Sequence, residues 1–368
     1  MRKKIEPERE ASARTLVARG NVKRGVRSAG KQGRGSSKSP TGKIRADTSG
    51  KAKPAAPAYA KAVAIEDDAT SEDAFRAIGM SCLRQVAAND AAVRALGSEG
   101  VHQMRVGLRR LRAAISIFSD LVDGKDTTKI KHELIWLTRR LAAARDLDVF
   151  IVESVKSLKK MRLEKNDLQA LRDSLEARRR EAFENARQAV NSPRYRKLIA
   201  DTHTWLEAGN WTSIQDEAAR SRRERPVEAL ATKTLTRLNK KVTRKAERLE
   251  HLDATKRHKL RIAIKKLRYS VEFFASLFRG DKAVKRRGGY KKSLKKLQDG
   301  LGKLNDITVH QKLAATLMRD FSQDKTTQKR IERAMDAVLQ RQEKQVAPTM
   351  RAAAKAASAL QEIKPFWR

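Results

Sequence analysis

The sequence predicts an all-α protein: two repeated helical bundles with pseudo-two-fold symmetry around a basic central channel, preceded by a disordered basic arm. Three observations predict this fold. Residues that favour helices (Ala, Leu, Arg, Lys, Glu, Gln) dominate two long stretches without proline, 58–192 and 227–347. Within them, apolar residues recur at spacings of three and four. Finally, two motifs occur twice in the same order.

The helices expected from this periodicity are separated by short polar turns, as in helical bundles. They cover residues 70–89, 99–122, 128–144, 146–161, 165–190, 194–208, 227–249, 254–279, 283–303, 305–321 and 326–345. Pro193, Pro226 and Pro348 are interpreted as breaks between them. The folded domain is expected over 62–360, with a first bundle at about 65–210 and a second at about 226–350.

The charge of the chain predicts a polyanionic partner. Of its 368 residues, 83 are Lys or Arg and 43 are Asp or Glu, which gives a net charge of +40. Nucleic acid, polyphosphate and an anionic membrane surface all fit this excess. Cys82 is the single cysteine, so no intrachain disulfide forms, as suits a reducing compartment. No apolar run approaches the ~18 residues of a membrane span. No secretory signal is visible either, and we expect a cytoplasmic protein without a membrane partner.

Residues 1–61 differ from the rest of the chain. They contain 17 Lys or Arg against four Asp or Glu, together with many Gly, Ser, Ala and Pro. Such a segment buries too little apolar surface to offset the entropy lost on ordering, so we expect a disordered basic arm. The arm's net charge of +13 leaves +27 on residues 62–368, so the folded part is strongly basic by itself.

The repeat consists of two motif pairs. The segment HQMRVGLRRLR begins at His102, and HKLRIAIKKLR begins at His258, 156 residues later. The segment LAAARDLDV follows the first copy, and LGKLNDITV follows the second. Leucines before and within these second motifs share one spacing, and we expect them in the core. Two motifs in one order at nearly one separation indicate a duplicated unit.

Each copy of the first motif places cations on one helix face and apolar residues on the opposite face, at ~100° per residue. The two cationic stripes consist of His102, Arg105, Arg109 and Arg112 in the first copy and His258, Arg261, Lys265 and Arg268 in the second. Like charges at these spacings repel one another, and a bound anion relieves that cost. Arg forms forked bonds to phosphate and Lys supplies a point charge. Two facing stripes therefore predict a channel for an extended chain of phosphates. Cations on the next helices are expected to widen it, namely Lys131, His132, Lys291, Lys292, Lys295 and Lys296.

Other polar residues have plainer interpretations. A single basic helix face is most often solvated surface, and duplication with His at the same place is what favours a binding face. Asp146 and Asp306 are expected to begin the next helix in each copy, as caps or in ion pairs. His203, His251 and His310 lie outside the motifs and are expected at the surface or at interfaces.

At these residues the sequence resembles the CHAD family, the conserved histidine α-helical domains. The two His-containing segments are similar to the family's signature helices, and the segment SPRYRKLIADTHTWL from Ser192 is also similar. The resemblance covers about 65–350. It implies two four-helix bundles around a basic pore, polyphosphate binding and, in bacteria, association with polyphosphate granules. By motif position, it implies anion binding by His102, Arg105, Arg109, Arg110, Arg112, His258, Arg261, Lys265, Lys266 and Arg268.

Two alternatives remain open from the sequence. The first is a non-specific nucleic-acid-binding protein that holds DNA or RNA through the basic arm and basic surface. Single-strand binding usually adds aromatic platforms, and Tyr269 alone stands beside a stripe. The second is an enzyme that transfers phosphoryl groups through His102 or His258.

The enzyme alternative fits the pattern less well. Phosphotransfer needs one exposed histidine, whereas both histidines stand in a cationic row. The segment HELIW at His132 lacks the second histidine that a zinc helix requires at i+4. We therefore expect no enzymatic activity, no metal and no cofactor, and the sequence leaves the oligomeric state open.

Overall fold

The computed structural model describes residues 56–158, 164–213, 216–319 and 325–368. The predicted disordered arm lies outside the described residues up to position 55. Within the described ranges the structure is helical and has no strand, so the predicted all-α class is confirmed. Three short 3₁₀ turns accompany the α-helices, which are α1 Ser71–Ala88, α2 Asp90–Arg94, α3 Ser98–Ile117, α4 Ser119–Val122, α5 Lys125–Arg140, α6 Ala142–Leu158, α7 Lys165–Asn191, α8 Pro193–Ala208, α9 Glu217–Glu224, α10 Val227–Ala246, α11 Ala254–Phe273, α12 Asp281–Arg319, α13 Lys325–Glu343 and α14 Val346–Gln361.

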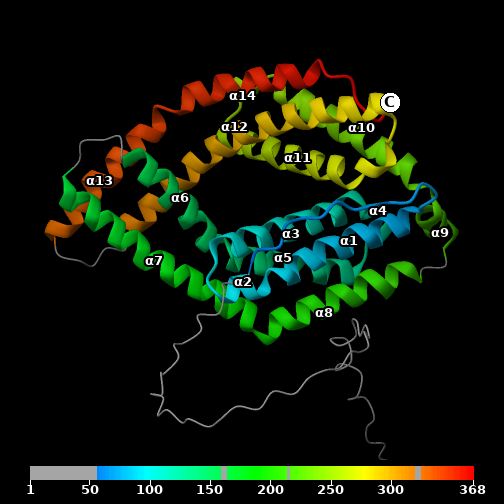
Figure 1. The fold of residues 1–368 in the computed structure, drawn as a ribbon, viewed down its shortest axis with the longest axis horizontal. Coiled ribbons are helices and arrows are strands. Elements are labelled where there is room, and N and C mark those ends of the chain that lie inside the picture. Colours follow the sequence, from blue (N-terminus) through cyan, green and yellow to red (C-terminus); the bar gives the residue numbers. More distant parts are fainter. Residues whose placement is uncertain (1–55, 159–163, 214–215, 320–324) are drawn as a thin grey trace, which may run out of the picture. The chain divides into compact units, whose positions relative to one another are not determined.

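The same order of helix contacts occurs in both halves of the chain. In the first half α1 packs on α3 and α8, and α5 packs on α3 and α8. In the second half α10 packs on α11 and α14, and α12 packs on α11 and α14 (Figure 1). Thus α1, α3, α5 and α8 correspond to α10, α11, α12 and α14. A pseudo-two-fold axis relating the two sets stays a prediction.

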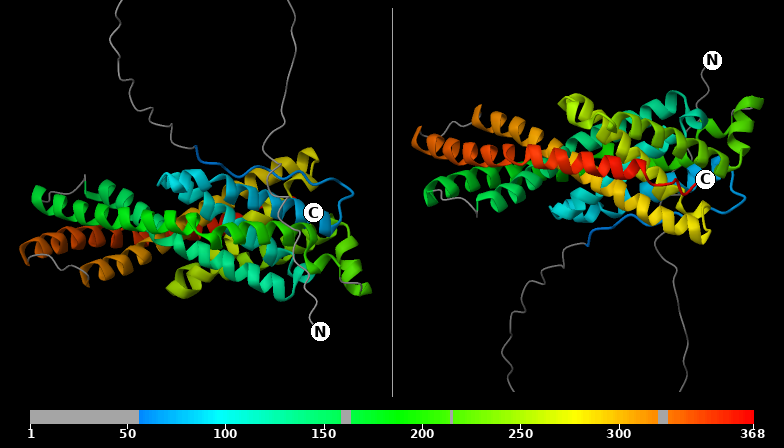
Figure 2. Two further views of the ribbon diagram at one scale, coloured as in Figure 1. Left: turned by 90° about the horizontal axis from the view of Figure 1, so that it is seen from below. Right: turned by 90° about the horizontal axis from the view of Figure 1, so that it is seen from above.

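The remaining helices join the two halves. Helix α7 packs on α6 and on α13, and α13 packs on α12. Figures 1 and 2 show α7 and α13 side by side, and the end of α7 reaches α8 of the first set. Arg333 on α13 donates two hydrogen bonds to the carboxylate of Asp167 on α7, at 2.9 and 2.8 Å. The halves also meet where α3 contacts α11, where α1 contacts α10 and where α6 contacts α12 and α13.

The core runs through both halves without a break. The apolar faces of the two motif helices are fully buried, including Met104 and Leu108 on α3 and Leu260 and Ile264 on α11. Fully burying one such side chain stabilises the fold by ~1.5–3 kcal/mol. Phe118 and Phe274, which occupy equivalent places in the two copies, lie 6.1 Å apart between ring centroids. The predicted core leucines are also buried, namely Leu134, Leu137, Leu141, Leu147, Leu294, Leu297, Leu301 and Leu304.

The prediction of separate helices at 283–303 and 305–321 is wrong, because α12 runs unbroken over 39 residues. Glycine is a poor helix former, yet Gly300 and Gly302 both lie within this helix. Gly300 has a packing role: a Cβ there would lie 2.9 Å from the Cβ of Ala353 on α14. Asp306 therefore sits inside a helix and does not begin one. In the first half the chain does break, between α5 and α6 at Leu141, and nothing in the local sequence explains it.

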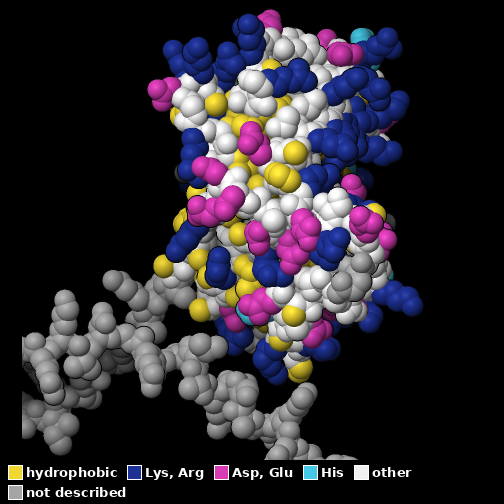
Figure 3. Space-filling view, turned by 90° about the vertical axis from the view of Figure 1, so that its right-hand side faces the viewer, with side chains coloured by type: hydrophobic (Ala, Val, Ile, Leu, Met, Phe, Trp, Pro, Cys, Tyr) yellow, Lys and Arg dark blue, Asp and Glu magenta, His cyan; other side chains and the backbone are white. Residues whose placement is uncertain are grey.

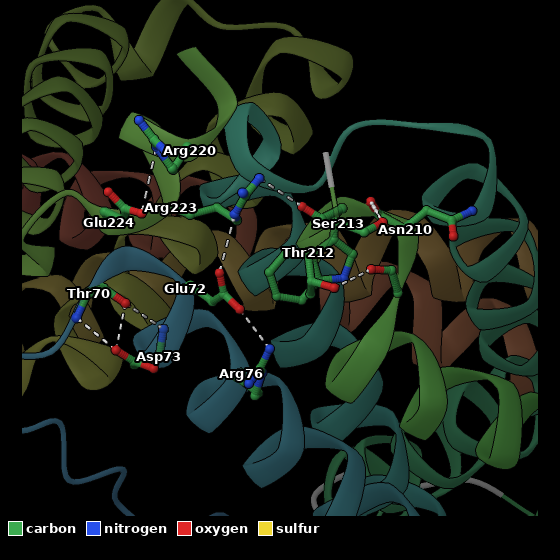
Figure 4. Close-up of polar contacts among 12 residues, drawn as sticks. Thr70, Glu72, Asp73, Arg76, Asn210, Thr212, Ser213, Arg220, Arg223 and Glu224 are labelled. Carbon is green, nitrogen blue, oxygen red and sulfur yellow. Dashed lines mark hydrogen bonds and ion pairs between the residues drawn. The ribbon is translucent and has the colours of Figure 1, made fainter. Parts of the chain in front are cut away.

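Three helices of the described residues are absent from the sequence prediction, namely the five-residue α2, α9 and α14. Helix α14 was missed because Pro348 was interpreted as a break. Pro348 stands in the first turn of α14, where its missing N–H has no helical acceptor to lose. Helix α9 is short and highly charged, so its apolar periodicity is weak. Asp216 caps it, and Arg223 reaches Glu72 of α1 at 3.5 Å (Figure 4).

The only cysteine is inert in this fold. Cys82 on α1 is fully buried, and burial raises the pKa of its thiol to about 12. Because the thiolate is the nucleophile, this pKa leaves Cys82 a core residue. Among the described helices, none is both long enough and apolar enough to cross a membrane.

Candidate anion-binding cavity

A cavity of about 1200 Å³ lies among α3, α6, α11, α12 and the end of α13, and we call it the central cavity. Both cationic stripes reach it. Seven of the predicted site residues line it, namely His102, Arg105, Arg109, His258, Arg261, Lys265 and Arg268. The structure thus brings together residues that are 156 positions apart in sequence. That the cavity continues as an open channel stays a prediction.

The close packing of α1 against the apolar face of α3 sets the orientation of α3. A Cβ at Gly107 would lie 2.8 Å from Cγ2 of Val86 on α1, so a side chain at this position would prevent the two helices from packing this closely. With Met104, Leu108 and Leu111 buried on the same side, the cationic stripe has to face away from α1. The equivalent apolar face of α11 is also buried, which directs His258, Arg261 and Lys265 toward the cavity.

The cavity holds donors that lack acceptors. The Nε atoms of Arg105, Arg109, Arg261 and Arg268 are buried and have no hydrogen-bond partner among the described residues. Leaving a buried polar group unpaired costs ~1–3 kcal/mol, and more when the group is charged. Two of these arginines come from each copy of the motif. An anion with several oxygens would satisfy all four at once.

Burial and the neighbouring cations also lower the pKa values of two side chains in the cavity, Lys265 and His102. Burial, with Arg261 and Arg109 nearby, lowers the pKa of Lys265 to about 7. Burial and the charge of Arg145 lower the pKa of His102 to about 4, so this histidine is neutral at pH 7. A bound anion acts in the opposite direction, because a nearby negative charge favours the protonated form of both groups.

Two carboxylates from the second motifs face these cations. Asp146 on α6 lies 3.8 Å from Nη2 of Arg105, so the predicted ion pair is present. Burial raises the pKa of Asp146, and the charge of Arg105 counteracts that rise. Asp306 on α12 lines the cavity too. The prediction that they begin helices is wrong, since both lie inside helices.

The other predicted site residues lie outside the lining of the central cavity. Arg110 is 3% exposed, donates a hydrogen bond to Oε1 of Gln85 at 2.9 Å and lies over the ring of Phe273. Its guanidinium therefore has partners within the fold. Lys266 donates to the carbonyl and hydroxyl oxygens of Ser116 on α3, at 3.0 and 2.6 Å. The lining also lacks Arg112 and the cations expected to widen the channel, namely Lys131, His132, Lys291, Lys292, Lys295 and Lys296.

The cavity also contains residues that the sequence analysis did not place there. Its further cations are Arg145, Lys303 and Arg341. His310 lines it as well and is 3% exposed, so it is not a surface histidine and lies at the interface of α12 with α6 and α13. The sequence could have placed α6 at the cavity. Arg145, Val149 and Glu153 recur every four residues, so they share one helix face, opposite the buried Leu147.

The cavity has no obvious place for a metal ion. Within the described ranges, no group of three or more His, Cys, Asp or Glu side chains is arranged to hold one. The carboxylates Asp146 and Asp306 stand among arginines and a lysine. His258 is instead held by a neutral partner, since its Nδ1 lies 3.0 Å from Oδ1 of Asn305.

The fold and the motifs have counterparts among known proteins. A model of the CHAD domain family matches residues 77–315. The crystal structure of the CHAD domain from the plant Ricinus communis is 29% identical, with a TM-score of 0.71, and the match covers 83% of this chain and 97% of that one. PptA from Streptomyces chartreusis has the same fold at 16% identity and a TM-score of 0.55, over 78% of this chain and 99% of that one. No curated protein matches the sequence. Because the family model spans well over half of the residues, the chain belongs to the CHAD domain family.

Proposed function

We propose that this protein binds inorganic polyphosphate in the central cavity, and that it is a binding protein and not an enzyme. The observation that carries the proposal is the set of buried arginine Nε atoms without partners on both motif helices. They lie in a cavity with eight Lys or Arg side chains against four Asp or Glu, and this excess of positive charge favours a bound anion. Membership of the CHAD family supports the same ligand.

A chain of phosphates suits the cavity better than a single phosphate does. From His102 to Arg109 the stripe rises by ~10 Å along α3, at 1.5 Å per residue. The second stripe reaches the same cavity from α11. A single phosphate contacts a few of these donors, whereas a linear chain places oxygens along both stripes. Affinity is therefore expected to rise with chain length until the cavity is filled.

Place in the cell follows from the ligand. A protein that holds polyphosphate chains would gather where they accumulate, so we propose association with polyphosphate granules in the cytoplasm. Fluorescence of the tagged chain should then coincide with a polyphosphate stain. It should disperse when Arg105, Arg109, Arg261 and Lys265 are all replaced by Ala. Equal granule association of that variant would contradict the proposal.

The direct test is a competition titration of the full chain against long-chain polyphosphate and duplex DNA at equal phosphate concentration and physiological salt. Polyphosphate is expected to bind more tightly, and the four-residue Ala variant should lose that preference. Affinity should fall steeply with salt, because cation–phosphate contacts release counterions. Equal or tighter DNA binding that the variant leaves unchanged would instead favour the nucleic-acid alternative.

The absence of catalysis needs its own measurement. Polyphosphate incubated with the protein should keep its length distribution on a gel and release no phosphate. The same assay with added Mg²⁺ and nucleoside diphosphate checks for phosphoryl transfer, and no nucleoside triphosphate is expected. Release or transfer that disappears when His102 or His258 is replaced by Gln would overturn this part of the proposal.

A further inference from the structure

A third row of cations runs along the exposed face of α10, and neither motif predicts it. The row consists of Lys233, Arg237, Lys240, Lys241 and Arg244, all of them exposed. Their spacings of four, three, one and three keep them on one side of the helix. No acidic residue occurs between Glu228 and Glu247. At 1.5 Å per residue, the α10 row spans ~16 Å.

Several cations on other surface helices are paired with acidic residues of the same helix. Arg187 pairs with Glu184 on α7, Lys197 with Asp201 on α8, and Lys295 with Asp299 on α12. The α10 row makes no ion pair with any described residue. Like charges at i, i+4 destabilise a helix by a few tenths of a kcal/mol per pair. Repulsion between like charges therefore destabilises the row, as it does the cationic stripes. Unlike the stripes, the row is exposed to solvent.

The α10 row did not arise from the duplication. Its counterpart in the first half is α1, where Arg76 is paired with Glu72 at 2.7 Å. Figure 4 shows this pair next to Arg223, which also reaches Glu72. Glu72 at the start of α1 thus pairs with both arginines. Helix α1 contains only two basic residues, Arg76 and Arg84, so it carries no row like that of α10.

The α10 row adjoins one of the two motif helices. Helix α10 packs along α11, and Lys266 of α11 faces the row. Burial and the charges of Arg237 and Lys241 lower the pKa of Lys266 to about 8, which places these three cations near one another. Lys266 also bonds to Ser116 at the end of α3, whose stripe lines the central cavity. Cations thus continue from the α3–α11 contact onto the outer face of α10.

The outer surface agrees with this arrangement. Figure 3 shows Lys and Arg side chains gathered along one side of the upper half, which the helices of the second half form. A groove of about 830 Å³ follows α10 and is lined by Lys233, Arg237 and Lys240, with Glu228 at its beginning. No aromatic side chain lines it, so the groove offers no platform for stacked bases.

We propose that the α10 row holds the part of a polyphosphate chain that extends beyond the central cavity. The inference rests on the proposed function and adds a second contact region to it. A chain anchored in the cavity presents its free end to α10 at a high effective concentration, so weak contacts at exposed cations add to affinity. Short chains that end inside the cavity do not reach the row.

The test compares three variants of the full chain on short and long polyphosphate. The row variant replaces Arg237, Lys240, Lys241 and Arg244 with Gln. Its matched control removes four exposed cations of the first half, Arg139, Arg140, Arg172 and Arg180, in the same way. We expect the row variant to lose on the order of tenfold in affinity for long chains at low salt. Its affinity for chains short enough to fit the cavity should stay within twofold of the unmodified protein, as should the control on both ligands.

The third variant, with Arg105, Arg109, Arg261 and Lys265 changed to Ala, separates this inference from the proposed function. If the unmodified protein binds no polyphosphate, or the cavity variant binds it normally, the proposed function fails. If the cavity variant loses binding while the row variant and the control behave alike, only the α10 inference fails. A row variant that loses duplex DNA binding and keeps full affinity for long polyphosphate also overturns it, and identifies α10 as a nucleic-acid surface.

Discussion

The two halves of this protein carry the same cationic stripe but surround it differently. Arg109 on α3 corresponds to Lys265 on α11, and Arg145 on α6 corresponds to Asn305 on α12. All four line the central cavity. The two copies thus keep the positions of the stripe residues, but they differ in residue type and therefore in charge at those positions. The shared positions define where the ligand lies, and the differences decide how each half responds to pH.

The largest effects should come from removing the stripe cations, first in one half and then in both. Changing Arg105 and Arg109 to Ala removes two charges that persist at any physiological pH, and should lower polyphosphate affinity by a hundredfold or more, at roughly 1.5–3 kcal/mol per charged contact. Changing Arg261 and Lys265 should cost less at pH 7.5, because the pKa of Lys265 is about 7. Isothermal titration calorimetry measures both.

Removal of all four side chains should abolish binding and leave the helix content unchanged by circular dichroism. The melting temperature of this variant is expected to be equal or higher, since repulsion within the stripes is gone. A collapse of helicity would show that the stripes are structural, and equal losses in the two double variants at every pH would remove the distinction between the halves.

An intermediate effect on polyphosphate affinity should follow from exchanging lysine and arginine at the equivalent positions 109 and 265. Bound phosphates favour protonated Lys265, so affinity should be full below pH 7 and fall as pH rises above it, by up to about tenfold per pH unit. Lys265→Arg keeps the charge and should flatten the profile between pH 6 and 9. Arg109→Lys should add a second titrating group and steepen it. Parallel profiles for all three proteins would contradict this account.

The smallest effect concerns the neighbours of the two histidines. Arg145 helps to hold the pKa of His102 at about 4, whereas His258 contacts neutral Asn305. Arg145→Asn copies the second half into the first and should raise the pKa of His102 as seen by NMR titration of its ring protons. Burial is the larger cause, so the value should remain below 6.5. Asn305→Asp, in the other half, should leave His102 unchanged.

The sequence predicted the features that repeat and missed those that do not. Periodicity with duplication located both motif helices, their buried leucines and the seven stripe residues at the cavity. The same approach missed α14, because Pro348 was interpreted as a break although it stands in the first turn of that helix. It also divided α12 in two, where Gly300 packs against α14 inside a continuous helix. It also overlooked the α10 row, which has no counterpart in the first half to draw attention to it.

The sequence also did not predict which basic side chains beside the stripes are buried in the fold. Arg110 and Lys266 stand directly beside stripe residues, and helix geometry alone does not show that Arg110 turns into a pocket with Gln85 and Phe273. Similarly, His310 is drawn into the cavity wall by its contact with Phe150, at 4.8 Å between ring centroids. These placements depend on how α3, α6 and α12 pack against their neighbours.

The contact between Phe118 and Phe274 has a thermodynamic consequence. Because equivalent rings of the two copies touch inside one continuous core, neither half keeps a complete hydrophobic interior when the other unfolds. The duplicated domain should therefore melt as one cooperative unit, with a calorimetric enthalpy equal to the van't Hoff enthalpy. A ligand bound between the stripes would then raise a single melting temperature for both copies, and occupancy would protect the whole domain against unfolding and proteolysis.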